Sequence, residues 1–346
     1  MRVVDTAQSR SEETAVAAAA RAGDESAFSS LVERYRRELE LHCYRMLGSL
    51  DDAEDVVQET FLRAWRKRET YAGRASFRAW LYRIATNACF DFLEKGDGRV
   101  IPSAQTADRR EILPPTDIPW LQPFPDRLLE QVAPRDGEPD AVVVTKETIE
   151  LGFLVAIQLL PPKQRAALIL RDVLDWSAKD TAELLETSVA SVNSALQRAR
   201  ATLQRHLPPR RREWAAGLNP TEEERALLQR YVDATERGDP DAMAKLLSED
   251  VRFSMPPESG TQVGRDAVVN GWVEGGFGAA WFGDFRCVIT RANRMPAVAC
   301  YHRKPGEPEY RAFALDVLKI ADGQIAEITA FDMRPILDAL GLPPTL

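Results

Sequence analysis

The sequence lacks the features that mark secreted, metal-binding or membrane-spanning proteins. Its only cysteines, Cys43, Cys89, Cys287 and Cys300, are scattered without paired spacing. Neither a disulfide framework nor a zinc site is indicated, and we expect buried, reduced thiols. No apolar run approaches the roughly 20 residues needed to span a bilayer, and residues 1–28 lack the apolar core of a signal peptide. We therefore expect a cytoplasmic protein that holds no metal and no cofactor.

The chain also lacks an excess of positive charge. Its 45 Lys and Arg residues face 53 Asp and Glu residues, which gives a net charge of −8. This balance argues against a protein that coats nucleic acid indiscriminately, but it allows a locally basic DNA-reading face. A length of 346 residues, with 45% hydrophobic and 28% charged residues, suggests two or three globular domains.

The stretch from Asp51 to Arg99 contains two helical patterns joined by a short Gly-containing loop. Both patterns carry an apolar stripe at helical spacing. The stripes consist of Ala53, Val56, Val57, Phe61, Ala64 and Trp65 in the first pattern, and of Phe77, Leu81, Ile84, Ala88 and Phe92 in the second. A different side of the second helix carries Trp80, Arg83, Asn87 and Asp91. An aromatic ring, a cation and an amide on one row are unusual for a helix face that only meets water.

The strings DAEDVVQETFLRAW (52–65) and FRAWLYRIATN (77–87) resemble region 2 of the sigma-70 family of initiation factors, in particular its extracytoplasmic-function (ECF) group. The resemblance implies that the first helix docks on the clamp of the largest polymerase subunit through Asp55, Gln58, Glu59 and Leu62. It also implies that the loop and second helix capture unpaired bases of the minus-ten promoter element. The residues expected there are Tyr71, Arg74, Ser76, Trp80, Arg83 and Asn87. The plainer alternative is a helical hairpin with ordinary exposed residues.

The segments on either side of this hairpin have different characters. Residues 1–22 are polar and alanine-rich, and we expect them to be flexible. Asp24 is the expected N-cap of an amphipathic helix that ends at Gly48 and completes a domain over residues 23–99. Residues 100–140 are rich in proline and acidic residues, which predicts a stiff, solvated linker. The resemblance implies that this linker threads through polymerase, but the role of its aromatic insertion, residues 118–125, is open.

Residues 141–207 return to a helical pattern. A helix is expected from Pro162 to Leu174, followed by a short helix (178–185), a turn (186–188) and a longer helix (189–206), which together form a helix-turn-helix. Behind a region 2 match, this resembles region 4, the reader of the minus-thirty-five element. The residues expected on its DNA-facing side are Ser188, Ser191, Asn193, Ser194, Gln197, Arg198 and Arg200. Arg205 and the run 210–212 are expected to hold phosphates, although that run also suits the start of a linker.

This region departs from the family pattern in two ways. Glu186 stands in the turn where glycine is common, and Asn193 and Ala195 stand where basic residues are common. The groove-facing surface is therefore less basic than usual, and we expect modest affinity from this domain alone.

After a second linker (208–220), residues 221–346 form a domain of another type. Two helices are followed by strand-like runs at 251–255, 285–291, 297–303, 310–320 and 324–331, with a helix at 264–273. This order predicts an α+β domain with a curved antiparallel sheet. The strings DVRF (250–253), GRDA (264–267) and DGQIAEITAF (322–331) resemble the SnoaL-like branch of the NTF2-like cone fold. The predicted chain is therefore multidomain, with two all-α sigma domains before an α+β cone domain.

A cone fold encloses a pocket, so catalysis has to be considered. The candidate acids and bases are His302, Asp316, Asp332 and Tyr301, and a carboxylate would need burial to raise its pKa. The alternative is a pocket filled by Trp272, Trp281, Phe253 and Phe313. We favour a non-catalytic regulatory domain that stands in for a separate anti-sigma protein.

Two functions are thus in view: an ECF sigma factor with a fused regulatory domain, and a SnoaL-type small-molecule enzyme with a DNA-binding appendage. The long match in Asp51–Arg99 favours the first, which is not an enzyme. The expected partners are the core RNA polymerase, through the clamp and the flap region, and promoter DNA. A small molecule in the C-terminal pocket is a further expected partner, and no membrane contact is expected.

Overall fold

The computed structural model describes residues 13–73, 75–95, 118–131, 149–206, 221–258 and 260–346. The chain divides into two compact units. A helical unit comprises residues 1–111, 128–148 and 156–209, and a C-terminal unit comprises residues 112–127, 149–155 and 210–346. The linker expected at 208–220, with its basic run 210–212, lies outside the described residues. Among the residues that are described, no helix is both long and apolar enough to cross a membrane.

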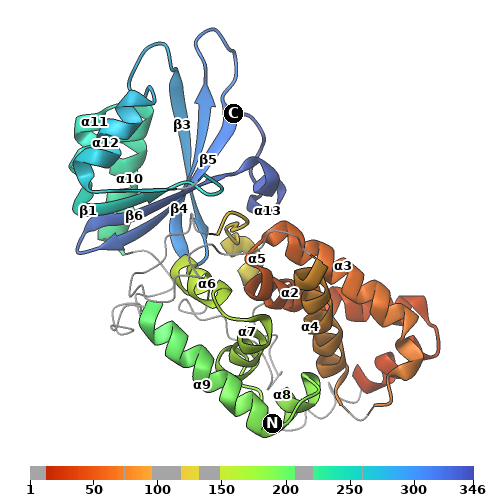
Figure 1. Ribbon diagram of the computed structural model, residues 1–346. Helices are drawn as coiled ribbons and strands as arrows, with labels where there is room; N and C mark the ends of the chain where they lie inside the picture. Colours follow the sequence, from red (N-terminus) through yellow and green to blue (C-terminus); the bar gives the residue numbers. More distant parts are fainter. Residues whose placement is uncertain (1–12, 74, 96–117, 132–148, 207–220, 259) are drawn as a thin grey trace. The chain divides into compact units, whose positions relative to one another are not determined.

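Three long helices form the first half of the helical unit (Figure 1): α2 (Glu25–Leu47), α3 (Leu50–Arg66) and α4 (Phe77–Lys95). Asp24 caps α2, because its carboxylate accepts a hydrogen bond from the N–H of Ala27 at 3.0 Å. Gly48 ends α2 with φ at 76°, a left-handed conformation that glycine adopts without steric cost. The helix expected between Asp24 and Gly48 is confirmed.

The second half of α2 is buried on all sides, so its polar side chains must find partners inside the bundle. Nε2 of His42 lies 2.9 Å from Oγ1 of Thr86 on α4. Burial lowers the pKa of His42 to about 3, and the ring is therefore neutral at physiological pH. The carboxylate of Glu40 pairs with Arg37 at 2.6 Å.

A helix at residues 13–21 precedes α2. Ala17 and Ala20 are buried, and the hydroxyl of Tyr35 donates a hydrogen bond to Glu13 at 2.5 Å. The expectation of a flexible N-terminus up to residue 22 was therefore wrong for these residues, because the alanine side chains are small enough to pack closely. Residues 1–12 lie outside the described part.

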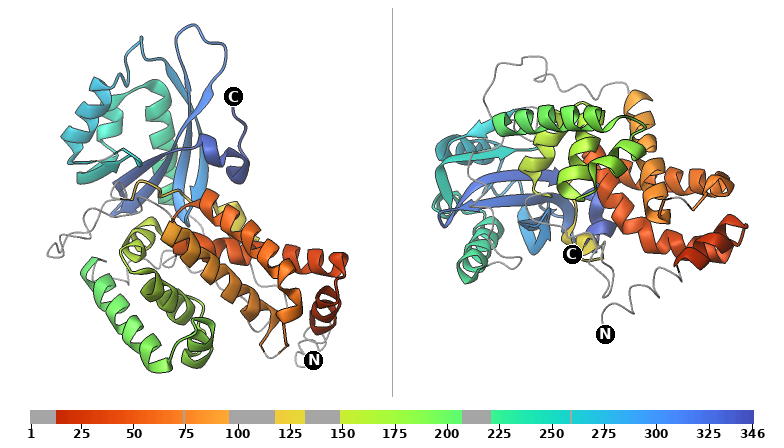
Figure 2. Two further views of the ribbon diagram at one scale, coloured as in Figure 1. Left: turned by 45° about the vertical axis from the view of Figure 1, so that its right-hand side comes forward. Right: turned by 90° about the horizontal axis from the view of Figure 1, so that it is seen from below.

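The chain after the linker forms α6 (Leu151–Gln158), α7 (Pro162–Leu168), α8 (Ala178–Leu184) and α9 (Val189–His206). The helix expected to reach Leu174 changes instead to a π-helical turn at Ile169–Val173. The helix-turn-helix formed by α8 and α9 is confirmed, and α9 runs along the edge of the helical unit in both views of Figure 2. Glu186 in its turn has φ at 53°, which explains why glycine suits this position.

Arg165 of α7 joins the two halves of the helical unit. Its guanidinium is buried and donates hydrogen bonds to the backbone carbonyls of Met46, Gln158 and Leu160. It also donates to the side chain of Gln158 at 2.5 Å. A buried cation needs this many acceptors, because each unsatisfied donor would lose its hydration without replacement.

The C-terminal unit is an α+β domain, as predicted. Its sheet has six strands in the order β2-β1-β6-β5-β4-β3. The strands are β1 (Leu247–Ser254), β2 (Thr261–Val263), β3 (Asp284–Ala292), β4 (Met295–Arg303), β5 (Arg311–Ala321) and β6 (Gln324–Asp332). The helices α10 (Glu222–Arg237), α11 (Pro240–Ala244) and α12 (Arg265–Glu274) lie over one face of this sheet (Figure 1).

The expected antiparallel sheet is confirmed for four of the five strand pairings, but β1 and β6 run parallel. These two strands come from opposite ends of the domain, so no tight hairpin forces them into antiparallel pairing. Short β2 was not predicted; it pairs antiparallel with β1 at the edge of the sheet.

Candidate polymerase, promoter and ligand sites

One row of α3 carries the four residues expected to contact polymerase. Positions 55, 58, 59 and 62 share one side of a helix by their spacing. Asp55, Gln58 and Leu62 are exposed, and Leu62 leaves 52% of its surface open to solvent. Oε1 of Glu59 accepts a hydrogen bond from Nε of Arg63 at 2.7 Å, so this carboxylate is oriented. An exposed leucine beside oriented and free acidic groups is a surface suited to a protein partner.

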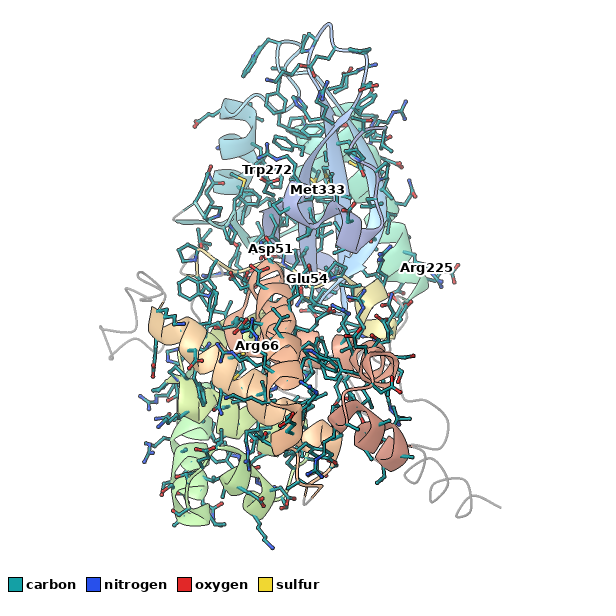
Figure 3. The ribbon with its side chains drawn as sticks, turned by 90° about the vertical axis from the view of Figure 1, so that its right-hand side faces the viewer. Asp51, Glu54, Arg66, Arg225, Trp272 and Met333 are labelled. Atoms are coloured by element: carbon teal, nitrogen blue, oxygen red, sulfur yellow. The ribbon has the colours of Figure 1, made fainter. Side chains whose placement is uncertain are left out.

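The charges of α3 are ordered along its axis. Figure 3 labels Asp51 and Glu54 in the first part of the helix, and Arg66 ends it. Acidic groups at the N-terminus and basic groups at the C-terminus both complement the helix dipole. The order therefore stabilises α3 and also explains why its exposed row begins with acidic residues.

The loop before α4 and the start of that helix bring three aromatic rings together. The ring of Tyr71 lies 5.3 Å from Phe77 and 5.5 Å from Trp80, and Phe77 and Trp80 are 5.3 Å apart. Phe77 is buried, whereas Tyr71 and Trp80 are partly exposed. The hydroxyl of Tyr71 donates to the carbonyl of Ala75 at 3.1 Å, which holds the ring over the loop. Two partly exposed rings supported by a buried one form a stacking platform of the kind that single-stranded bases use.

The polar residues expected to read the minus-ten element are in different situations. Ser76 caps α4, because its Oγ accepts a hydrogen bond from the N–H of Ala79 at 3.1 Å. Asn87 is exposed and is available for a base edge. Nη2 of Arg83 donates to the carbonyl of Glu183 on α8 at 3.1 Å, so this cation is engaged within the helical unit. Arg74 lies outside the described residues.

The residues expected on the DNA-facing side of region 4 are all exposed: Ser188, Ser191, Asn193, Ser194, Gln197, Arg198 and Arg200. Two of them have structural partners. Ser188 accepts a hydrogen bond from the N–H of Ser191 at 3.1 Å, and Nη2 of Arg200 pairs with Asp172 at 2.6 Å. The amide of Gln197 and the guanidinium of Arg198 remain the side chains best suited to base edges.

The aromatic insertion of the linker packs within the C-terminal unit. Ile118, Leu121 and Phe124 are buried, so the expectation of a solvated linker was wrong for this segment. Apolar side chains at every third position bury one face of the segment. The N–H of Phe124 donates to Oδ1 of Asn293 at 2.8 Å, and the N–H of Asn293 donates back to the carbonyl of Phe124 at 2.8 Å. The other linker residues, 100–117 and 132–140, lie outside the described part.

The turn between β3 and β4 holds this linker segment by charge as well. Asn293 and Arg294 have φ at 55° and 58°, as a two-residue hairpin turn requires. Oδ1 of Asp126 accepts a hydrogen bond from the N–H of Arg294 at 2.7 Å, and Oδ2 accepts one from Nε of Arg291 at 3.1 Å. Burial raises the pKa of Asp126 above its ordinary value, although both arginines oppose this shift. The carboxylate is thus held at an energetic cost, and it depends on these partners.

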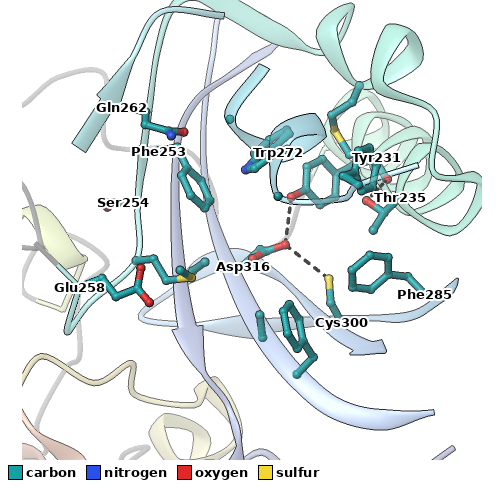
Figure 4. Close-up of a pocket in the computed structure, with 18 of the residues that line it drawn as sticks. Tyr231, Thr235, Phe253, Ser254, Glu258, Gln262, Trp272, Phe285, Cys300 and Asp316 are labelled. Carbon is teal, nitrogen blue, oxygen red and sulfur yellow. Dashed lines mark hydrogen bonds between the residues drawn. The ribbon is translucent and has the colours of Figure 1, made fainter. Parts of the chain in front are cut away.

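The C-terminal unit contains a cavity of about 480 Å³ between the sheet and its helices (Figure 4). Asp316 of β5 lines it. Oδ2 of Asp316 accepts hydrogen bonds from the hydroxyl of Tyr231 at 3.0 Å and from Sγ of Cys300 at 3.4 Å. Burial raises the pKa of Asp316 to about 6, and the two hydrogen bonds limit the shift. The Asp316 end of the cavity is therefore polar and contains an ionisable group.

Of the four candidate acids and bases, only Asp316 lines the cavity. Tyr301 donates to the carbonyl of Pro343 at 2.8 Å, and the ring of His302 lies 3.0 Å from the carbonyl of Phe282. Asp332 pairs with exposed Arg334 at 2.6 Å. The four side chains therefore do not converge on one reaction centre.

The alternative of a pocket filled by aromatic side chains was also wrong. Phe253, Trp272 and Phe313 line the cavity and leave it open, and Trp281 is 68% exposed.

Sequence reasoning did not single out the partners of two acids. They are Tyr231 and Cys300 at Asp316, and Arg291 and Arg294 at Asp126. Two weak signals could have found them. Asp316 is a charged residue on a strand face that otherwise carries Ala314, Leu318 and Ile320. Asn293 and Arg294 stand between two strand-like runs, where a tight turn is expected.

Family descriptions match three successive parts of the chain. They are Sigma-70 region 2 (residues 31–99), Sigma-70, region 4 (residues 151–203) and the SnoaL-like domain (residues 228–328). The ECF RNA polymerase sigma factor SigG of Mycobacterium tuberculosis is 40% identical over 92% of this chain and 85% of its own length. The ECF RNA polymerase sigma factor SigW of Bacillus subtilis is 30% identical over 54% of this chain and 91% of its own length.

The crystal structure of the Mycobacterium tuberculosis sigma factor SigJ is similar in fold. It is 24% identical, with a TM-score of 0.56, and the likeness covers 91% of this chain and all of that one. The three family matches and the relationship to SigG show that the chain belongs to the ECF group of RNA polymerase sigma factors, with a C-terminal SnoaL-like domain, and that it is a transcription initiation factor rather than an enzyme.

Proposed function

We propose that this sigma factor docks on the clamp of core polymerase through the α3 row of Asp55, Gln58, Glu59 and Leu62. The exposed leucine and the two acidic groups support this role, since they offer both apolar and charged contact. The Tyr71–Trp80 platform with Asn87 then captures unpaired minus-ten bases, and α9 reads the minus-thirty-five element near the polymerase flap. These steps take place in the cytoplasm, where polymerase acts.

In the arrangement that the helical unit adopts, the two proposed DNA-reading surfaces cannot bind their promoter elements at the same time. Arg83 of α4 is bonded to the carbonyl of Glu183 on α8, and the ring of Tyr82 on α4 lies 5.3 Å from Trp176 just before α8. The two promoter elements lie about 25 base pairs, or roughly 85 Å, apart along B-DNA. We infer that α4 and the helix-turn-helix separate when the protein joins polymerase, which also frees Arg83 for DNA.

The C-terminal unit regulates this opening by holding the linker. The observation that carries this proposal is a set of hydrogen bonds between the linker and the β3–β4 hairpin. Asn293 binds the backbone of Phe124, and Arg291 and Arg294 bind the carboxylate of Asp126. We call these contacts the hold on the linker. A linker that threads through polymerase has to leave this turn first. The hold therefore competes with assembly and does the work of an anti-sigma protein from within the same chain.

Substitution of the linker carboxylate tests the regulatory role. Asp126→Ala removes the acceptor for Arg291 and Arg294, whereas Glu130→Ala changes an exposed acid in the same helix, α5 (Asp126–Glu130). We expect Asp126→Ala, and a chain that ends at Asn219, to bind core polymerase more tightly and to increase promoter-directed transcription. We expect Glu130→Ala to behave as the original protein. Unchanged output from both the Asp126→Ala protein and the shortened chain would remove the regulatory proposal.

We also propose that the cavity beside Asp316 binds a small-molecule ligand. Its volume of about 480 Å³ lies in the range of ligand pockets. Its aromatic wall and few polar groups have the composition of a binding site. A ligand there would stabilise the sheet that carries the β3–β4 turn, and it would therefore affect the hold on the linker.

A further inference from the structure

The polar end of the cavity offers one unused acceptor (Figure 4). The hydrogen bonds that the Asp316 carboxylate accepts from Tyr231 and Cys300 both arrive at Oδ2. Among the described residues, none donates a hydrogen bond to Oδ1. The side chain is not fully covered either, because Asp316 keeps partial exposure on the cavity side. A ligand that enters the cavity therefore meets a carboxylate oxygen that is still free to accept a hydrogen bond.

The wall of the cavity is a continuous run of aromatic rings. Phe253 lies 5.4 Å from Trp272, and Trp272 lies 6.3 Å from Phe277. Phe277 lies 6.3 Å from Phe285, which lies 5.9 Å from Phe313. Such a wall buries an apolar body, and its ring faces carry partial negative charge that attracts cations.

The charged side chains that line the cavity are all acidic. Asp316 and Glu258 are the ionisable acids of its lining, and no lysine, arginine or histidine occurs among the described lining residues. An anionic ligand would meet two carboxylates and the negative faces of the rings. A cation is favoured by all of these groups, and it also supplies the charge that a desolvated carboxylate with only neutral partners needs.

We propose that the cavity binds a hydrophobic amine, whose apolar body packs on the aromatic wall and whose protonated amino group donates a hydrogen bond to Oδ1 of Asp316. This inference rests on the proposed function, in which the cavity holds a small-molecule ligand. The amine is specified by chemistry alone: one cationic nitrogen at one end of a compact, mostly aromatic or alicyclic body.

Three probes with the same ring system separate charge from shape: 1-naphthylmethylamine, 1-naphthylmethanol and 1-naphthoate. Their binding to the full-length protein is measured by titration calorimetry at pH 7.5. We expect the amine to bind more tightly than the alcohol by roughly tenfold or more, since a hydrogen bond to a charged group is worth about 1.5–3 kcal/mol. We expect the carboxylate to bind most weakly.

Two substitutions locate the site. Asp316→Asn should abolish the preference for the amine and leave the affinity for the alcohol within about twofold, because only the charged contact is lost. Trp272→Ala should weaken the amine and the alcohol alike. The matched control is Asp332→Asn, which neutralises a carboxylate on the neighbouring strand outside the cavity and should change nothing. Thermal unfolding of each variant shows that it is folded.

The pH dependence gives an independent readout. Because the pKa of Asp316 is about 6, amine affinity should rise as the pH increases from 5 to 7, whereas alcohol affinity should stay nearly constant. Equal binding of the amine and the carboxylate, or amine binding that survives Asp316→Asn unchanged, would overturn the inference about the amine alone. Failure of all three probes to bind would overturn the ligand proposal itself.

Discussion

The two units of this sigma factor arrange their polar groups in opposite ways. In the helical unit, buried polar side chains such as His42 and Arg165 connect helices, and the groups that we propose to contact partners lie on exposed or partly exposed rows of α3, α4 and α9. In the C-terminal unit, the group that we propose to bind a ligand, Asp316, is half-buried and lines a cavity. A surface for polymerase and DNA needs large exposed rows, whereas recognition of a small molecule needs a desolvated pocket.

Removal of a buried connector should affect the helical unit most. Arg165→Met keeps the side chain's length but leaves the carbonyls of Met46, Gln158 and Leu160 without this donor. We expect a loss of about 3 kcal/mol or more in the free energy of unfolding, because each buried unsatisfied group costs about 1–3 kcal/mol. Urea denaturation measures this loss. Exposed Lys163 on the same helix supplies the control Lys163→Met, and equal stability of both variants would contradict the role of Arg165.

Two ionisable groups, one in each unit, should respond to acid in opposite directions. The pKa of His42 falls to about 3 in the folded state, so the unfolded chain binds the proton more readily and stability is lost as pH drops below about 6.5. The pKa of Asp316 rises to about 6, so the folded state binds the proton more readily, and stability is gained as pH drops from 6 to about 4. Each effect should reach about 1–3 kcal/mol over this window.

Hydrogen exchange, corrected for intrinsic rates, resolves the units separately. The acid loss in the helical unit should shrink in His42→Gln, and the acid gain in the C-terminal unit should vanish in Asp316→Asn. If both units lost protection equally and neither variant changed the pattern, the contrast between the units would fail.

The exposed aromatic platform should contribute directly to promoter melting. Trp80→Ala removes one ring of the Tyr71–Trp80 pair, and loss of a base-stacking surface costs about 1–3 kcal/mol. We expect open-complex formation, followed by permanganate reactivity of unpaired thymines, to weaken by the equivalent of this cost. Trp80→Phe retains a ring and should restore most of the activity. Binding to core polymerase should stay unchanged in both variants, and a parallel loss there would indicate misfolding.

The smallest effect is expected in the turn of the helix-turn-helix. Glu186 has φ at 53°, so Glu186→Gly should relieve strain and stabilise the protein by about 0.5–1 kcal/mol. Glu183→Gly in the neighbouring helix α8 should instead destabilise it by about 1 kcal/mol. Thermal unfolding distinguishes the two signs, and a destabilising Glu186→Gly would contradict the explanation for glycine at this turn.

The helical unit could be predicted well from sequence because its information is local. Asp24 and Gly48 bound α2, apolar stripes at helical spacing placed α3 and α4, and the short-helix, turn, long-helix pattern placed α9. What sequence could not provide were contacts between distant segments. The hydrogen bond from Arg83 to Glu183 joins residues a hundred positions apart, and no local pattern encodes it.

The C-terminal unit was predictable in class but not in its site. The strand register brings Cys287 opposite Cys300, with their sulfur atoms 3.6 Å apart, although the two cysteines have no paired spacing in sequence. The pairing of β4 with β5 brings Cys300 close to Asp316, and the packing of α10 supplies Tyr231. The linker segment at Phe124 was expected in solvent because prolines dominate its composition. The apolar residues at every third position, Ile118, Leu121 and Phe124, instead indicate a buried face.

Association with core polymerase tests the central claim most directly. The double reversal Asp55→Lys with Glu59→Lys changes the α3 row, and reversal of Glu222 and Glu223 on α10 makes the same change in net charge elsewhere. We predict that the α3 variant loses about 100-fold or more in affinity for core polymerase, as expected for reversed charges at an interface, and that the α10 variant binds normally. Equal affinity of the α3 variant and the original protein for core polymerase would contradict the account.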